Sequence, residues 1–424
     1  MSSPREVNSP GAEAKSQTAA SSDGDPFDGA GELSESLLID QVLSRNPSLV
    51  QMTAAWEAAA SRYPQAVSLE DPMFGFTASP SSINSNSVEF GYRLEVSQKL
   101  PFSGKRDLRG TGALADADAA ARDVDDMKLQ LVESAKVSLA DYYLAQRALE
   151  VNDEGIKLLE SFRNRAKDRY EKVPGANEQD ILQADVELGR QRQRQIQLER
   201  LREVVQARLN TLVHVPPDRR LPPPPQKLTK DEAPGDVAIL RQQARAKRPD
   251  LLALENRIKA DEAALALAER EYWPDFEVGA AYDTIMGNGP TRDLAAQVGI
   301  RMNVPIRLSK RDAATAEARA RLQQRKAELA KQTDQIHFQV QEAFAQLREA
   351  NRIVDLYEKT LLPKSKGNVE AAESSYVGGR IPFVSLIEAQ RGYVEIQDRY
   401  YEALAERFRR QANLERVTGG RQPD

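Results

Sequence analysis

VEFGYRLEVSQKLPFSGKR at residues 88–106 and LAAQVGIRMNVPIRLSKR at residues 294–311 are the two stretches that decide the fold. In each stretch, apolar and polar residues alternate over 9 to 11 positions. This is the period of a β-strand with one apolar face, and strands of that length cross a bilayer when they are tilted. Each run ends at a proline that is soon followed by a Lys-Arg pair. We therefore expect two strands with one apolar face, either crossing a bilayer or half-buried on a soluble core, and each leading directly into another element.

Each strand has an upstream partner. Apolar runs at 73–78 and 276–284 precede them, across segments rich in Ser, Asn, Gly and Pro that predict turns. The sequence therefore predicts two β-hairpins, at about 73–99 and about 276–304. The Lys105-Arg106 and Lys310-Arg311 pairs fit two roles, anchoring at a membrane interface or starting a helix, and we favour the first.

The hairpins are part of an internal repeat. RNPSL at 45–49 returns as KRPDL 202 residues later, and ILQA at 181–184 returns as LIEA 205 residues later. The matches keep one order, so the chain is predicted to hold two copies of one unit, at 33–213 and 237–417. The connector at 214–236 contains seven prolines, which favour an extended path. Residues 1–32 are rich in Ser, Ala, Gly and Asp and predicted to be disordered, and 418–424 form a short tail.

A heptad pattern predicts a long helix after each hairpin, at about 105–172 and about 309–377. At 1.5 Å per residue the first would be roughly 100 Å long. The seam of the second helix comprises Ile336, Val340, Ala343, Leu347, Ala350, Val354, Tyr357 and Leu361. The seam of the first comprises Leu131, Ala135, Ser138, Tyr142, Ala145, Leu149 and Ile156.

Turns at Pro174-Gly175 and Gly378-Gly379 reverse the chain into return helices at about 178–213 and 382–417. A further helix, at about 237–272, leads to the second hairpin. Each unit thus reads as helix, β-hairpin, long helix, turn and helix. The predicted fold is mainly α with a small β part.

Composition excludes several classes of function. The net charge is −5, which gives no electrostatic reason to expect a nucleic acid partner. The chain has no cysteine, and its only histidines, His214 and His337, lie on different elements, so neither is expected to bind metal. No apolar run approaches the roughly 18–20 residues of a transmembrane helix. We can assemble no catalytic group of residues and expect neither an enzyme nor a cofactor.

These residues together resemble the TolC-like outer-membrane efflux factor family over about 33–418. The resemblance rests on Asn46-Pro47, on the residues that end the strands at 100–106 and 304–306, and on YVGG at 376–379 followed by LIEAQ at 386–390. The resemblance implies a homotrimer, in which a twelve-stranded β-barrel in the outer membrane continues into a long α-helical barrel. It also implies a passive exit duct for drugs or metal ions, and the PFSGKR exit looks more like the metal-efflux branch.

The resemblance further implies partners and site residues. A periplasmic adaptor would dock at the tip, around Pro174, Gly175, Gly378 and Gly379, and an inner-membrane transporter, of resistance-nodulation-division type, would supply the energy. Asp180, Arg380 and Glu388 would gate the periplasmic mouth. Asp180 fits equally well as part of a capping box at 177–180.

The alternating strands assign residues to the two faces of the barrel. The lipid-facing residues would be Phe90, Tyr92, Leu94, Val298 and Ile300, and Arg93, Glu95 and Arg301 would face the lumen. Trp273 and Tyr272 suit an interfacial position, with ordinary packing nearly as good an interpretation.

Two other classes of protein remain open. A soluble coiled-coil scaffold would explain the heptads but not the duplicated hairpins. A periplasmic adaptor would have a single helical hairpin within β domains. Residues 1–31 show no basic start followed by an apolar core, so no signal peptide is visible and this segment alone favours a cytosolic protein. The rest of the chain favours the outer membrane of a Gram-negative-type cell.

Overall fold

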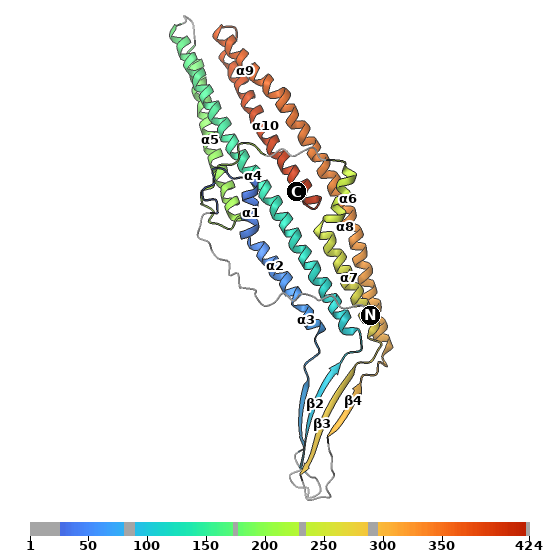
Figure 1. Cartoon of the computed structure of the whole chain (residues 1–424). Helices are drawn as coiled ribbons and strands as arrows, with labels where there is room; N and C mark the ends of the chain where they lie inside the picture. The colour runs from blue at the N-terminus through green and yellow to red at the C-terminus, as the bar shows by residue number, and fades with distance from the viewer. Residues whose placement is uncertain (1–25, 80–89, 173–176, 229–234, 287–295, 421–424) are drawn as a thin grey trace.

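The computed structural model describes residues 26–79, 90–172, 177–228, 235–286 and 296–420. The chain is elongated, with long helices over most of its length and a small sheet at one end (Figure 1). Both hairpin turns, and the tip residues Pro174 and Gly175, lie outside the described residues.

The two predicted units are present in the same element order. The first comprises α1 (Glu35–Arg45), α2 (Pro47–Ala60), α3 (Arg62–Val67), β1 (Met73–Ser79), β2 (Phe90–Leu100), α4 (Lys105–Lys172) and α5 (Gln179–Leu212). The second comprises α6 (Val237–Lys247), α7 (Pro249–Arg270), β3 (Phe276–Met286), β4 (Gln297–Met302), α8 (Leu308–Leu356), a π-helical turn η1 (Tyr357–Leu361), α9 (Leu362–Val377) and α10 (Phe383–Val417). The mainly helical, duplicated fold is therefore confirmed.

The repeated Xaa-Pro motif breaks a helix in both units. The helix expected at 237–272 is two helices, because Arg248 is extended and Pro249 starts α7. Asn46 and Pro47 separate α1 from α2 in the same way, and the Asn46 side chain caps α2 by accepting from the Ser48 N–H at 2.9 Å. Proline disfavours a helical conformation in the preceding residue and suits the first helical position.

The second long helix is also interrupted. Its seam is buried from Ile336 to Val354, as predicted, but Tyr357 and Leu361 lie in the π-helical turn, which contains no buried residue. Pro363 is the second residue after this turn, and proline removes a helical hydrogen bond and clashes with the carbonyl four residues before it. In the first unit α4 runs through 68 residues without a break.

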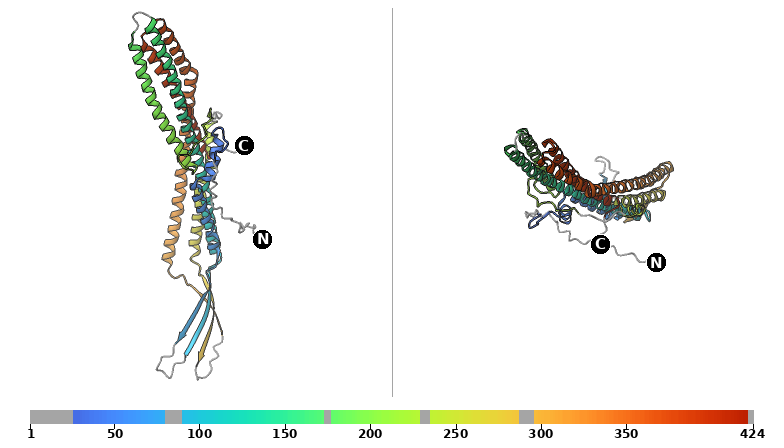
Figure 2. Two further views of the ribbon diagram at one scale, coloured as in Figure 1. Left: turned by 90° about the vertical axis from the view of Figure 1, so that its left-hand side faces the viewer. Right: turned by 90° about the horizontal axis from the view of Figure 1, so that it is seen from above.

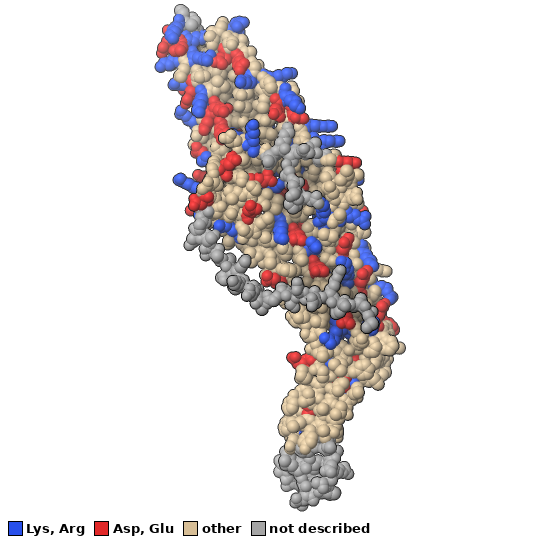
Figure 3. Space-filling model, viewed as in Figure 1, with Lys and Arg blue, Asp and Glu red and all other residues tan. Residues whose placement is uncertain are grey.

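The four strands form one antiparallel sheet in the order β1-β2-β3-β4. The register places the apolar residues on one face: Phe74, Phe76, Tyr92, Leu94, Val96, Val278, Tyr282, Val298, Ile300 and Met302. The opposite face carries Arg93, Glu95, Lys99, Glu277 and Arg301. Figure 3 shows charged side chains throughout the helical part and few on the visible side of the sheet.

The helices pack through separate apolar clusters along the length of the molecule. One cluster joins α1, α4 and the end of α5, and a second fills the tip between α4, α5, α9 and α10. Phe27 and Leu33 are buried in the first cluster, so the packed part of the chain begins before the boundary at residue 33 that the sequence suggested. Seen from above, the helices form a curved layer with the blue N-terminal helices on its convex side (Figure 2).

Lys105 is fully enclosed at the junction between sheet and helices. Its ammonium donates to Asp275 Oδ1 at 2.8 Å and to the carbonyl of Trp273 at 3.1 Å. The anchoring role favoured for Lys105 at a membrane interface is therefore wrong, because the ammonium cannot reach a headgroup. Arg106 binds the carbonyl of Val67, and Arg311 binds the repeat-equivalent carbonyl of Glu271. No helix in the described part of the chain is both long and apolar enough to span a bilayer.

Candidate functional site

The tip of the second unit is closed by a glycine turn. Gly379 has a φ of +70°, its N–H bonds the carbonyl of Tyr376, and the Arg380 N–H bonds the carbonyl of Ser375 at 2.8 Å. This is the pattern of a helix that ends in a left-handed residue, where glycine is favoured. The turn brings the start of α10 beside the end of α9 and fixes Tyr376 at the end of the helix.

Asp180 contacts Tyr376 across the two units. The Tyr376 hydroxyl donates to Asp180 Oδ2 at 2.9 Å, and the ring packs edge-on against Phe383 with centroids 5.2 Å apart. Arg169, near the end of α4, stacks over the same ring and donates to the Tyr376 carbonyl at 3.0 Å. Burial, followed by the neighbouring Asp180 carboxylate, raises the pKa of Tyr376 to about 12.

Asp180 also lies in the first turn of α5, where a carboxylate is favourable. The N-cap residue of α5, Glu178, makes no side-chain capping bond, and just before it Asn177 Oδ1 accepts a hydrogen bond from the Gln179 N–H at 3.0 Å. Arg380 and Glu388 are exposed, and among the described residues the structure gives neither side chain an ion-pair partner. Of the three predicted gate residues, Asp180 is the one whose side chain is hydrogen-bonded to the other unit within the part of the chain that the structure describes.

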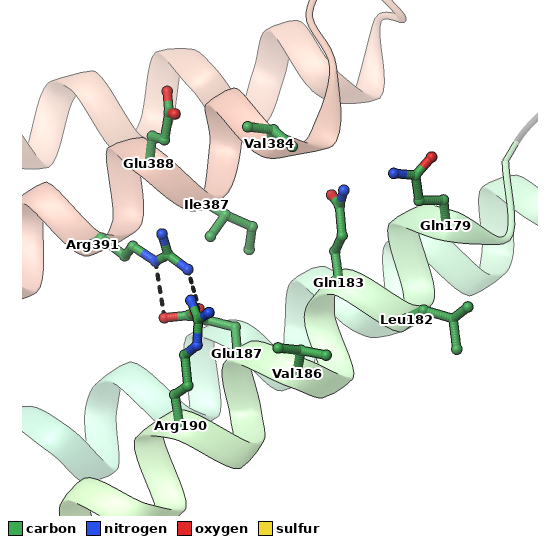
Figure 4. Close-up of a pocket in the computed structure, with 10 residues that line it drawn as sticks. All are labelled: Gln179, Leu182, Gln183, Val186, Glu187, Arg190, Val384, Ile387, Glu388 and Arg391. Atoms are coloured by element: carbon green, nitrogen blue, oxygen red, sulfur yellow. Dashed lines mark hydrogen bonds and ion pairs between the residues drawn. The ribbon is translucent and has the colours of Figure 1, made fainter.

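A groove of about 360 Å³ runs between α5 and α10 just below the tip (Figure 4). Leu182 and Val186 line one wall, Val384 and Ile387 line the other, and Glu388 lies on the rim. At its lower end Arg391 donates from Nε to Glu187 Oε1 at 3.0 Å and from its Nη2 to the other oxygen. Gln179, Gln183 and Arg190 complete the lining, so the groove is mixed in character, with four apolar side chains among polar ones and an ion pair at its lower end.

The Glu187–Arg391 pair and its neighbour were not found from the sequence. Arg194 and Asp398 form a second pair one heptad further on, with the charges reversed. Both pairs join positions 204 residues apart, which is almost the repeat offset. The sequence therefore contained a signal for these ion pairs, namely opposite charges at equivalent positions of two units that lie side by side.

Hydrogen bonds from Arg391 lower the pKa of Glu187, so this pair should stabilise the tip above the unfolded-state pKa, near 4.5. The contribution should be lost as the pH falls through the lower, folded-state pKa. We expect Glu187→Gln to destabilise the tip by about 1 kcal/mol at pH 7, because Arg391 is partly exposed. The difference from the parent protein should be smaller at pH 3, below the unfolded-state pKa, than at pH 7. Hydrogen exchange of α5 and α10 amides at both pH values measures it, with Glu388→Gln as the control. An effect of equal size at pH 3 would contradict an ionic contribution.

The sheet arranges the predicted lipid-facing residues as one surface. Val298 and Ile300 are 79% and 72% exposed, and Leu94 pairs with Phe76 on one side and Tyr282 on the other. Tyr92 lies on the same face, whereas the side chain of Phe90 falls outside the described residues. On the opposite face Arg301 binds Glu95 and lies 3.5 Å from Glu277.

The two histidines lie on different elements. His214 occupies the turn after α5 with a φ of +60°, and His337 lies on α8. In the part of the chain that the structure describes, no three His, Cys, Asp or Glu residues are grouped so that they could hold a metal ion. Trp273 is 55% exposed and stacks on Phe102 at 5.1 Å, so it combines the packing and surface positions.

Comparison with solved structures shows the same fold. The outer-membrane channel OprN is 19% identical, with a TM-score of 0.76 over 94% of this chain and 95% of OprN. The outer membrane protein VceC of Vibrio cholerae is 16% identical, with a TM-score of 0.76 over 91% and 96% of the two chains. The open state of the Neisseria gonorrhoeae MtrE channel is 18% identical, with a TM-score of 0.74 over 91% and 89%. No match was found among curated proteins.

The family comparison covers both units. The family model described as outer membrane efflux protein matches residues 38–213 and 240–420, which leaves only the N-terminal segment, the connector and the last few residues outside. The matched ranges coincide with the two internal units of helix, hairpin, long helix and return helix. The chain therefore belongs to the outer membrane efflux protein family.

Proposed function

We propose that this chain is the outer-membrane channel of a tripartite efflux system and forms a passive exit duct for small substrates such as drugs or metal ions. The observation that carries the proposal is the four-stranded sheet at one end of the long helices, exposed and apolar on one face and charged on the other. A sheet with such faces suits a barrel wall between lipid and a wet lumen. Its residues then have structural roles and perform no catalysis.

The working form is a homotrimer. The sheet has two open edges, β1 and β4, and unpaired strand edges are not tolerated in lipid. Two copies would give eight strands, whose interior is filled by side chains, whereas three give twelve and leave room for an aqueous lumen. The long helices of the three copies would continue the barrel away from the membrane.

We expect the protein in detergent to have a mass of about 141 kDa, three times the 47.1 kDa of one chain. Light scattering coupled to size exclusion, corrected for bound detergent, measures this mass. The same sample in planar bilayers should conduct ions. A stable monomer or dimer that does not conduct would refute the proposal.

At the far end, the helical tip would be the periplasmic mouth and the docking site of an adaptor, which in turn links to an inner-membrane transporter. Two features support this. The groove between α5 and α10 is lined by Val384, near the start of α10 and five residues after Gly379 in the chain. Asp180 and Tyr376 join the two units there, with Arg380 and Glu388 exposed nearby. A three-fold axis would gather three copies of these charged residues around the mouth. A partner that binds in the groove could then separate the three copies and open the mouth.

A further inference from the structure

Equivalent helices of the two units are buried to different extents. In the second unit α7 buries Pro249, Leu251, Ala253, Leu254 and Ala263 against α4 and α8. Its counterpart α2 packs on α4 but has no buried residue, and Val50 on it is 63% exposed. The helix α7 thus packs against a long helix of the other unit, α4, and α2 has no equivalent neighbour on that side.

The long helices show the complementary difference. Near its start α4 buries Lys105, Gly110, Ala115, Ala117, Ala119 and Val124. The same stretch of α8, 205 residues later, buries only Thr315 before Ile336. In this region α4 packs against α2 of its own unit and against α7 of the other unit. The helix α8 packs against α7 of its own unit and lacks the second neighbour, from another unit, that α4 has in α7. In the repeat, α8 corresponds to α4 and α2 corresponds to α7. The uncovered faces of α8 and α2 therefore correspond to the two surfaces that meet in the α4–α7 contact.

The junction residues repeat this difference. Lys105, which follows β2, is fully enclosed by Asp275 and Trp273 at the start of β3. Lys310 follows β4 at the equivalent position but is exposed, and the structure gives it no ion-pair partner among the described residues. At the start of β1, Asp71 is also exposed and has no ion-pair partner there, while Glu70 pairs only with Lys99, at 3.1 Å. The free ammonium and the free carboxylate lie at opposite edges of the same sheet.

We propose that Lys310 of one copy docks beside Asp71 and Glu70 of the next copy, and so repeats between chains the contact that Lys105 makes within the chain. This rests on the proposed ring of copies. The occupant of the uncovered α8 face is α2 of the second copy, because that contact is the image of the α4–α7 contact. Such a head-to-tail contact leaves both surfaces exposed in a single chain and closes a ring when the rotation permits.

The repeat also predicts the strand register between copies. The β2–β3 pairing of Gln98 with Val278, shifted by 204 residues, pairs Met302 of β4 with Phe74 of the next copy's β1. The same shift turns the β1–β2 pairing of Phe74 with Val96 into the observed β3–β4 pairing of Val278 with Ile300, and it makes Asp71 the equivalent of Asp275. Met302 and Phe74 are both on the apolar face, 60% and 69% exposed.

A charge exchange tests the contact. We expect Lys310→Glu to reduce the fraction of trimer that survives dilution in detergent by about tenfold, because it places like charges together. Asp71→Lys should have a similar effect, and the double variant should restore most of the trimer. Lys157→Glu, at an exposed lysine of α4 with no ion-pair partner among the described residues, is the control and should leave the trimer unchanged.

Crosslinking gives an independent readout, because the chain has no cysteine. With cysteines at 310 and 71, a short bismaleimide should link copies into dimers and trimers on a denaturing gel, whereas cysteines at 157 and 71 should not be linked. If the parent is trimeric but the 310–71 pair is not linked and the charge exchange gives no rescue, the contact is refuted and the channel proposal stands. If the parent itself is not trimeric, both are refuted.

Discussion

Leu94→Arg is expected to prevent most of the protein from assembling in a membrane. Leu94 lies on the apolar face of the sheet, between Phe76 and Tyr282 in the register. An arginine on the lipid face of a barrel costs about 2–4 kcal/mol near the bilayer midplane. In a trimer the cost is incurred three times, so the equilibrium of assembly should shift by several orders of magnitude. Refolding into lipid vesicles, followed by a gel assay for heat-resistant trimer, measures it.

Glu95→Gln is the matched control, at the adjacent position on the opposite face. Arg301 binds Glu95 but also lies near Glu277, so the cation keeps one carboxylate in the variant. Exposed ion pairs contribute about 0–1 kcal/mol, and assembly should therefore be close to that of the parent. Equal assembly of both variants would show that the apolar face does not meet lipid.

The regular parts of this fold could be predicted because their patterns are local. Alternation over 88–96 identifies a strand, and a heptad from Ile336 to Val354 identifies a packed helix, without any knowledge of distant residues. The breaks were harder to predict. The Xaa-Pro motif was used to align the two units, although Pro249 also starts a new helix. Pro363 opens the helix into a π-turn and so removes Tyr357 from the seam.

The tip could be predicted only in part, because its contacts join residues about 200 positions apart. The repeat and the resemblance pointed to Asp180, but no local pattern indicates that the Tyr376 hydroxyl is its partner. Lys105 was misjudged for the same reason. A basic residue after a strand resembles an interfacial anchor, whereas Asp275 and Trp273, which enclose it, lie in the other unit.

Tyr376→Phe should open the periplasmic mouth and raise the single-channel conductance several-fold. The change removes the hydroxyl that donates a hydrogen bond to Asp180 and preserves the ring that packs against Phe383 and Arg169. A hydrogen bond to a charged group contributes about 1.5–3 kcal/mol, and three copies would act on one mouth. Loss of all three contacts is enough to move a mostly closed population to a mostly open one. Recording from single channels in planar bilayers measures the change.

Tyr142→Phe is the control that separates the gate from a general loss of stability. The Tyr142 hydroxyl is likewise enclosed and donates to the Pro222 carbonyl at 3.1 Å, but it lies where the connector crosses α4, away from the tip. This variant should lose about 1 kcal/mol of stability, somewhat less than Tyr376→Phe because its acceptor is uncharged, and keep the parent conductance. The pKa of Tyr376, near 12, adds a second check. Because the raised folded-state pKa keeps the hydroxyl protonated, its contribution is complete below pH 10 and is lost only as the pH approaches 12. The conductance difference between Tyr376→Phe and the parent should therefore be constant from pH 6 to pH 9. If Tyr376→Phe conducts like Tyr142→Phe, the contact with Asp180 is only structural and the mouth is held by other residues.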